Sequence, residues 1–305
     1  MASVTSLPLT PDQEKLRSGL VAGLGAYLLW GFLPLLFKLV EGVGSVGVVA
    51  ERTFWSLLFV GGILLLTRRF GEVRTALSSF ATVRAMAISA LLLAGNWLIY
   101  VWAVETEQVL EASFGYFVNP MINVAIGMVV LGERHNRVQG IAIAIALLAL
   151  VIQAIGLGRI PYIALSLAVT FAFYGYVRKT AHVAATAGLF VETLLLAPLA
   201  IGFLAWSFIS NGPGLHADPG IAALLVLTGP ATAVPLLLFN YAVQRLRLTT
   251  IGMLQYIAPS IAFVLAIVVF GEELNLLRVI SFGLIWLSLA VFTMGSVQRR
   301  VPPPA

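Results

Sequence analysis

The sequence contains no cysteine, few histidines and little charge. The absence of cysteine from all 305 residues excludes disulfide bonds, thiolate metal ligands and cysteine nucleophiles. The three histidines, His135, His182 and His216, fall in predicted loops, and neither an HExxH pattern nor a GxxxxGK[ST] pattern occurs. The sequence therefore indicates no metal site, no cofactor and no ATP hydrolysis, and we predict that the protein is not an enzyme.

Charge is scarce because most of the chain is apolar. Charged residues make up 10% of the chain and hydrophobic residues 60%, whereas a soluble domain is about 25% charged. A transmembrane helix needs roughly 20 apolar residues, and ten runs of about that length can be marked. We therefore predict an all-α integral membrane protein whose ten transmembrane helices lie at about residues 18–39, 46–67, 84–104, 110–131, 138–157, 160–179, 186–209, 220–244, 249–270 and 276–296.

The basic residues indicate how these helices are oriented. A net charge of +5 and a pI near 9.7 could suggest nucleic-acid binding, but placement explains the charges better. Fourteen of the eighteen Lys and Arg residues fall at one side of the predicted spans, and the others are Lys38, Arg52, Arg159 and Arg278. Because basic residues favour the cytoplasmic side, we predict cytoplasmic tails at residues 1–17 and 297–305. The expected partners are membrane lipid and a small-molecule substrate, not nucleic acid.

The span at residues 110–131 carries a proline at its midpoint. Pro120 removes one backbone donor and displaces the carbonyl of Tyr116, four residues earlier. Inside a membrane, a carbonyl freed in this way must be satisfied by protein or by a water-filled cavity. Tyr116, Asn119 and Asn123 share one helical face because they are three and four residues apart. This face is predicted to line a polar path, with plain interhelical hydrogen bonding an equal alternative for Asn123.

The same element recurs 139 residues later. Pro259 follows Pro120 at this offset, and three further pairs keep the register: Ala103 with Ala242, Gly132 with Gly271, and Glu133 with Glu272. Such self-similarity indicates a duplication. Since each half holds five spans, an odd number, the second half, residues 160–296, must be inverted relative to the first, residues 18–157. Inverted repeats recur in secondary transporters, which bind substrate near the membrane midplane.

Several strings resemble the drug/metabolite transporter superfamily, in particular the RarD-like branch of the EamA families. The strings are residues 26–31 (AYLLWG), 52–56 (RTFWS), 96–104 (NWLIYVWAV), 110–120 (LEASFGYFVNP) and 132–134 (GER). The resemblance implies ten helices in two inverted halves, a bacterial cytoplasmic (inner) membrane location and export of small metabolites. Similar proteins include bacterial exporters of aromatic and other amino acids, and some RarD-like members are associated with chloramphenicol resistance. One departure is Glu51, where RarD-like sequences are expected to have histidine.

Polar and aromatic side chains near the middle of the spans are the candidate binding residues. An amide without a partner is costly in hydrocarbon, so these groups should face the bundle interior. Freed carbonyls could hold an ammonium group, and aromatic faces a planar side chain. Packing or interhelical hydrogen bonding is the alternative interpretation of each residue. The predicted substrate-binding residues are Trp30, Asn96, Tyr100, Tyr116, Asn119, Tyr174, Asn240, Gln255 and Tyr256, and the predicted hinges are Pro34, Pro120 and Pro259.

Two carboxylates are candidates for coupling transport to an ion. Glu51 and Glu192 lie at corresponding places near the starts of the second and seventh spans. An intramembrane carboxylate suggests function, whereas a carboxylate at the membrane interface only complements a helix dipole. Separately, Gly19 and Gly23 form a GxxxG pattern, which permits close helix contact. The sequence is compatible with a monomer or a homodimer.

These patterns predict a secondary transporter that works by alternating access. The expected substrates are amino acids, aromatic or bulky and apolar, and the alternative is efflux of neutral drugs such as chloramphenicol. A hypothesis of another class is a membrane scaffold or receptor that transports nothing, in which the interior polar residues serve folding alone.

Overall fold

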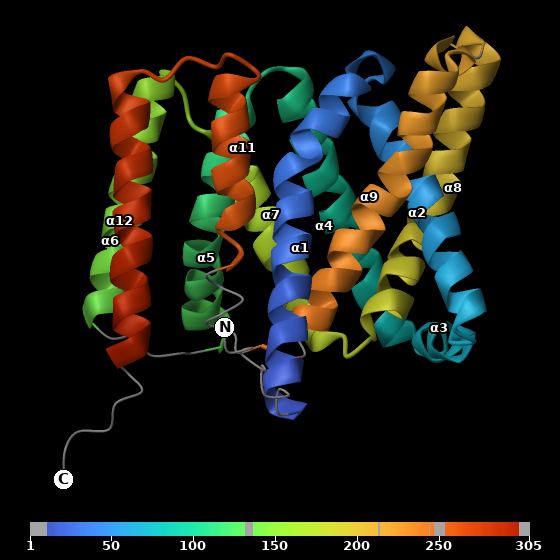
Figure 1. Cartoon of the computed structure of the whole chain (residues 1–305), viewed down its shortest axis with the longest axis horizontal. Coiled ribbons are helices and arrows are strands. Elements are labelled where there is room, and N and C mark those ends of the chain that lie inside the picture. The colour runs from blue at the N-terminus through green and yellow to red at the C-terminus, as the bar shows by residue number, and fades with distance from the viewer. Residues whose placement is uncertain (1–10, 132–136, 213, 244, 247–253, 299–305) are drawn as a thin grey trace, which may run out of the picture.

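The structure is a computed structural model that describes residues 11–131, 137–212, 214–243, 245–246 and 254–298 (Figure 1). Within these ranges the secondary structure is helical throughout. Eleven α-helices and two short 3₁₀ helices are present: α1 (Pro11–Leu39), η1 (Glu41–Val43), α2 (Ser45–Leu66), α3 (Phe70–Leu77), α4 (Phe80–Glu105), α5 (Val109–Leu131), α6 (Arg137–Leu157), α7 (Tyr162–Thr180), α8 (Ala185–Asn211), η2 (Gly214–Ala217), α9 (Pro219–Val243), α11 (Ile257–Val268) and α12 (Leu276–Gln298).

Each of the ten predicted spans coincides with a helix, although the span at 249–270 lies partly outside the described residues. Six described helices, α1, α2, α4, α6, α8 and α9, include a segment that is long and apolar enough to cross a membrane. Shorter apolar segments lie in α7, α11 and α12. The protein is therefore a multi-pass membrane protein with apolar helices throughout.

Two helices extend beyond the predicted spans. Residues 11–17, which we predicted as part of a tail, form the start of α1, and α12 continues to Gln298. The beginning of α1 has the residues that favour a helix start. Pro11 occupies the first helical position, where its missing N–H costs nothing, and Asp12 and Glu14 lie near the positive end of the helix dipole.

The longest predicted loop, residues 68–83, contains a further short helix. Helix α3 lies along one edge of the bundle (Figure 1) and buries Val73 and Ala76, which are three residues apart and so share a face. Arg69 and Glu72 form an ion pair of 2.7 Å at its exposed side. The second predicted loop, residues 210–219, likewise holds η2. Short amphipathic elements of this length escape a search for twenty-residue apolar runs.

The helices stand side by side, and elements far apart in the sequence are neighbours. In Figure 1, α6 and α12 pair at one end of the bundle, α2, α8 and α9 lie at the other, and α1, α4, α5, α7 and α11 lie between them. The described chain begins and ends at the same edge, where α1 starts and α12 finishes (Figure 1).

Close helix packing depends on glycines at a few contacts. A β-carbon at Gly115 of α5 would lie only 2.6 Å from the carbonyl oxygen of Ala164 in α7, and one at Gly229 of α9 would lie 2.5 Å from the backbone of Trp55 in α2. The GxxxG glycine Gly23 packs against Ala242 of α9 within the same chain. That pattern therefore serves contact between helices of one molecule.

The two prolines that define the repeat have different surroundings. Pro120 lies inside the continuous helix α5. Pro259 instead lies in the first turn of α11, after a break in the helix at Gln255 and Tyr256. The equivalence predicted from sequence spacing therefore does not extend to helix geometry, because a proline in a first turn requires no kink.

Candidate functional site

The centre of the candidate site is a buried arginine on α2. Arg52 lies about two turns inside the start of this helix and is only 3% exposed. Its guanidinium carbon is 4.2 Å from the ring centroid of Trp97 on α4 and 5.0 Å from that of Phe37 on α1. The Nε–H donates a hydrogen bond of 3.1 Å to Oγ1 of Thr232 on α9. Four helices thus hold this guanidinium in one orientation.

One edge of this guanidinium makes no hydrogen bond to the described part of the chain. The Nη1 atom of Arg52 is buried without a partner there, and no described carboxylate forms an ion pair with Arg52. Placing a charged arginine in the hydrocarbon region costs about 2.5–3.5 kcal/mol on insertion scales. Each cation–π contact can offset up to about 2 kcal/mol when desolvated. The two rings therefore make the buried charge tolerable without neutralising it.

The neighbouring Glu51 is not the counterion of Arg52. Consecutive residues of a helix point about 100° apart, and Glu51 faces a different set of groups. Its Oε1 lies 2.7 Å from Nε2 of His216 in η2, and its Oε2 accepts a hydrogen bond of 2.8 Å from Nε1 of Trp55. The pairing with His216 was not predicted, because 165 residues separate the two.

Two of the predicted binding residues, Tyr100 and Tyr116, lie beside Arg52, and Asn96 and Asn119 adjoin Tyr116. The Tyr116 hydroxyl donates to Oδ1 of Asn96 at 3.2 Å, and the rings of Tyr100 and Tyr116 make an edge contact at 5.7 Å. Both phenol groups lie close enough to Arg52 to interact with its charge. Asn119 lies on α5 close to Tyr116, three residues further along the helix. The i,i+3 and i,i+4 spacings on two adjacent helices account for this convergence.

The two asparagines of this group also join helices. Asn96 Nδ2 donates to the Leu167 carbonyl at 3.1 Å and to Thr170 Oγ1 at 3.0 Å, and Asn119 Nδ2 donates to the Ala168 carbonyl at 3.0 Å. All three acceptors belong to α7. Interhelical hydrogen bonding, the alternative interpretation of these residues, is therefore part of their role.

The remaining predicted residues lie in other surroundings. Trp30 packs against Phe239, Tyr174 against Phe171, and Tyr256 stacks on Phe117. Asn240 donates to the Leu236 carbonyl of its own helix, and Gln255 is half-buried in the turn before α11. The side chain of Asn123 lies outside the described residues. Trp30 and Tyr174 pack on the same buried cluster as Trp97, and the ring of Phe171 contacts both Tyr116 and Tyr174, so these two residues adjoin the group around Arg52.

Glu192 is fully buried on α8, about two turns from the start of the helix. Its Oε1 accepts a hydrogen bond from Ser89 on α4 at 2.5 Å and lies 3.6 Å from Nε of Arg178. Its Oε2 has no hydrogen-bond partner among the described residues. Glu51 is also buried and about as deep in α2.

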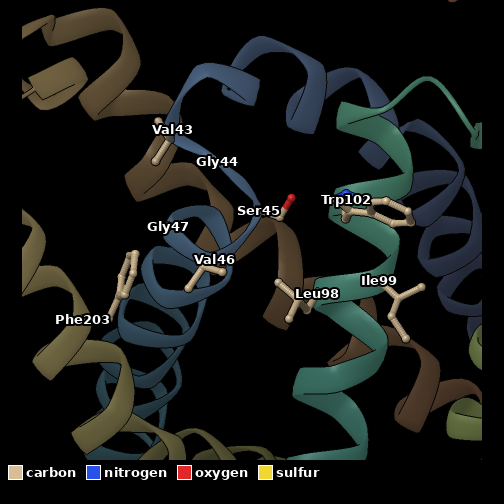
Figure 2. A pocket seen from close by; sticks show the side chains of 9 residues that line it. All are labelled: Val43, Gly44, Ser45, Val46, Gly47, Leu98, Ile99, Trp102 and Phe203. Carbon is tan, nitrogen blue, oxygen red and sulfur yellow. The ribbon is translucent and has the colours of Figure 1, made fainter.

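Two cavities lie at the edge of the bundle where α4 and α5 are connected. The larger, about 580 Å³, lies beside the start of α2 and the end of α4 (Figure 2). Figure 2 shows that apolar groups form it, and its lining residues are Val43, Gly44, Ser45, Val46, Gly47, Leu98, Ile99, Trp102 and Phe203. The smaller, about 260 Å³, is polar and includes Glu111, Arg159 and Glu272. None of the predicted binding residues lines either cavity.

Comparison with known proteins shows close relatives over nearly the whole chain. The EamA-like transporter family matches residues 17–154 and 160–294. An uncharacterized transporter of Pseudomonas aeruginosa is 44% identical, with 95% of this chain and 98% of that protein covered. Protein RarD of Escherichia coli is 38% identical, with 95% and 99% covered, and a protein of P. aeruginosa named chloramphenicol-sensitive protein RarD is 30% identical, with 89% and 92% covered.

A solved crystal structure shares the fold. It superposes with a TM-score of 0.62 over 94% of this chain and all of the other, at 21% sequence identity.

Proposed function

Because the chain belongs to the EamA-like transporter family, we propose that it is a secondary transporter that exports amino acids with aromatic or bulky apolar side chains. The observation that carries this proposal is the cluster of Asn96, Tyr100 and Tyr116 around Arg52 in the bundle interior. Polar groups placed inside a membrane protein mark the paths of solutes and ions. Aromatic rings beside them suit a substrate with a planar apolar side chain.

The architecture of two inverted halves is also part of the proposal. In the proposed repeat, α1, α2, α4, α5 and α6 correspond in order to α7, α8, α9, α11 and α12. When each helix is replaced by its counterpart, the contact between α1 and α9 becomes that between α7 and α4, and the contact between α1 and α11 becomes that between α7 and α5. The contacts of α2 with α8, of α5 with α11 and of α6 with α12 join counterpart helices and are therefore unchanged by this exchange. This pairing supports repeats at residues 18–157 and 160–296 that rock against each other in alternating access.

We further propose a cytoplasmic (inner) membrane location with both termini in the cytoplasm. The described chain starts and finishes at one edge of the bundle (Figure 1), and fourteen of the eighteen basic residues fall on that predicted side. Arg52, one of the four exceptions in the sequence count, is buried in the bundle and is not a loop charge. Removing it from the count strengthens the asymmetry on which the orientation depends.

The remaining predicted site residues keep their proposed roles. Trp30, Tyr174, Asn240, Gln255 and Tyr256 would join the substrate path in a conformation in which the halves have moved. Pro34, Pro120 and Pro259 would act as hinges. Glu51 and Glu192 are the candidates for ion coupling, and exchange of Glu192 for Gln should abolish gradient-driven accumulation while leaving solute exchange.

Solute flux into proteoliposomes tests the proposed function. Wild type should transport phenylalanine above the rate of empty liposomes, and Tyr116→Ala should transport less, after normalisation for folded protein. Wild-type flux equal to that of empty liposomes over a panel of amino acids would reject amino-acid transport, and equal flux over all solutes would favour the scaffold hypothesis.

Chloramphenicol efflux is the second candidate, because one relative carries the name chloramphenicol-sensitive protein RarD. Growth of cells that express the protein separates the two candidates. Protection against toxic amino-acid analogues without protection against chloramphenicol supports amino-acid export, and the reverse pattern supports drug efflux.

A further inference from the structure

We propose that Arg52 binds the carboxylate of the transported solute, so that the transporter selects organic carboxylates and does not require their ammonium group. This inference rests on the proposed function, and it names the chemical group that the site recognises. The sequence did not indicate it, because Arg52 was counted there as a charge at the outer ends of the helices.

The first observation is a donor that the protein leaves unused. Nη1 of Arg52 is buried without a hydrogen-bond partner among the described residues, whereas Nε is bonded to Thr232. A buried charged group normally has its hydrogen bonds satisfied, and an orphaned donor on a residue that is 3% exposed requires a partner from outside the described chain. An anion supplies both the missing acceptor and the missing charge.

The second observation is that the guanidinium carbon lies over two aromatic rings. The guanidinium carbon is 4.2 Å from the ring centroid of Trp97 and 5.0 Å from that of Phe37. Cation–π attraction of this kind does not need an N–H hydrogen bond. The guanidinium is planar and presents its donors as a fork that matches a carboxylate. A guanidinium that is held by two ring contacts and one hydrogen bond retains donors for a ligand.

The third observation concerns the groups beside it. Tyr100 and Tyr116 lie within electrostatic reach of Arg52 and bring two further hydroxyl groups and two rings to the same place. Arg52 forms no ion pair with a described carboxylate, and the adjacent Glu51 is engaged by His216 and Trp55. The described site thus presents a positive charge with aromatic walls, which fits a carboxylate attached to an apolar body.

The burial of Arg52 also bears on the transport cycle. In this conformation the residue is enclosed by α1, α2, α4 and α9, so a solute reaches it only after the helices separate. A bound carboxylate neutralises the guanidinium, so the enclosed conformation has a lower energy with solute than without it. Binding and closure would therefore be linked.

Three probes separate the chemical groups of the solute. Phenylalanine carries both charges, phenylpyruvate carries only the carboxylate, and phenylalanine amide carries only the ammonium. We expect purified wild-type protein to bind the first two with affinities within about tenfold of each other, and to bind the amide at least about 30-fold more weakly, as measured by calorimetry in detergent. Tight binding of the amide by wild type would overturn the proposal.

Variants distinguish ligand binding from a purely structural role. Arg52→Gln should lose at least about 30-fold in affinity for phenylpyruvate, and Arg52→Lys should retain part of the affinity because it keeps the charge but loses the fork. The matched control is Arg245→Gln, which removes an exposed arginine that lies 3.4 Å from the ring centroid of Tyr241, and it should bind like wild type.

Arg52→Gln also removes the two ring contacts and the hydrogen bond to Thr232, so its effect on folding is measured separately. Thermal unfolding of each variant in detergent, with affinities normalised for folded protein, supplies that measurement. If folded Arg52→Gln binds phenylpyruvate with unchanged affinity, the proposal is wrong, and a lowered unfolding temperature in that case would make Arg52 a structural residue. If wild type transports neither phenylalanine nor phenylpyruvate in proteoliposomes, the proposed function fails instead.

Discussion

Ser113 of α5 donates a hydrogen bond of 2.7 Å to the carbonyl oxygen of Pro259 in α11. One turn further along α5, the ring of Phe117 stacks on that of Tyr256, with centroids 6.3 Å apart. The two proline-bearing helices, one from each half of the chain, are thus in direct contact. The two helices are closed on each other at this level, and in the proposed alternating access these contacts would change.

Loss of the Ser113 hydroxyl should destabilise this contact. In Ser113→Ala the carbonyl of Pro259 loses its donor, and interhelical hydrogen bonds in membrane proteins are worth about 0.6 kcal/mol on average and at most about 1.7. We expect a small decrease in the unfolding temperature in detergent. Ser18→Ala is the control, since Ser18 bonds only to the Lys15 carbonyl within α1. If the two substitutions lower the unfolding temperature equally, the hydrogen bond between Ser113 and Pro259 does not stabilise the contact between the halves.

A methyl group at Gly115 should be poorly tolerated. Its β-carbon would lie 2.6 Å from the carbonyl oxygen and 2.7 Å from the Cα of Ala164, so α5 and α7 would have to separate. Overpacking of this kind costs typically about 1–3 kcal/mol. Gly115→Ala should therefore lower the unfolding temperature by several degrees.

Gly95→Ala provides the comparison for Gly115→Ala. A β-carbon at Gly95 in α4 meets no atom within 4 Å, and alanine favours a helix more than glycine does. This variant should be as stable as wild type or more so. A destabilised Gly95→Ala together with an unaffected Gly115→Ala would contradict the packing of α5 on α7.

The hydroxyl of Tyr116 should matter more for transport than for stability. Tyr116→Phe removes a hydrogen bond of 3.2 Å to Asn96 but keeps the ring contact with Tyr100. We expect an unfolding temperature within a few degrees of wild type and a several-fold increase in the KM for phenylalanine in proteoliposomes. An unchanged KM with a clearly lowered unfolding temperature would favour the purely interhelical role.

Glu272 should make stability depend on pH. Its carboxylate accepts hydrogen bonds from the N–H groups of Val109 and Leu110 at the start of α5, and burial raises its pKa to about 7 despite these bonds. The pKa of the unfolded state is near 4.5, so the folded state binds the proton more tightly between these values. The stability contributed by this protonation is complete below about pH 4.5 and is lost as the pH rises through 7.

The variant Glu272→Gln isolates this effect because glutamine can accept the same bonds but does not titrate. The unfolding temperature of the variant minus that of wild type should rise between pH 5 and pH 8. Glu72, exposed on α3 and paired with Arg69, supplies a control in Glu72→Gln. A difference that stays constant with pH for Glu272→Gln would contradict the raised pKa.

Apolar run lengths predicted where the helices lie because each membrane span must be long and apolar, whatever it packs against. They could not reveal α3, which is short and covers the bundle edge. Spacing of three and four residues predicted that Tyr116 and Asn119 share one face of α5, and in the structure Tyr116 bonds to Asn96. Spacing does not say which helix that face contacts, and so the bonds of Asn96 and Asn119 to α7 were not foreseen.

Arg52 shows the main gap in the sequence prediction. Near a predicted helix start, an arginine is normally a loop or interface residue, and nothing in its neighbours along the chain distinguishes it. Its burial depends on Phe37, Trp97 and Thr232 from three other helices. Such a site is defined only by tertiary contacts, as is the pairing of Glu51 with His216.

Alternating access to the cluster around Arg52 is the central claim, and the cysteine-free sequence makes it directly measurable. A single cysteine in Tyr100→Cys would be exposed to a membrane-impermeant thiol reagent from either face of oriented vesicles, with Ala149→Cys, in the packed core on α6, as the control. We expect labelling at Tyr100→Cys from both faces, at rates that phenylalanine or phenylpyruvate changes in opposite directions at the two faces, and no labelling of the control. Labelling from neither face, or from one face only at a rate that no solute alters, would contradict it.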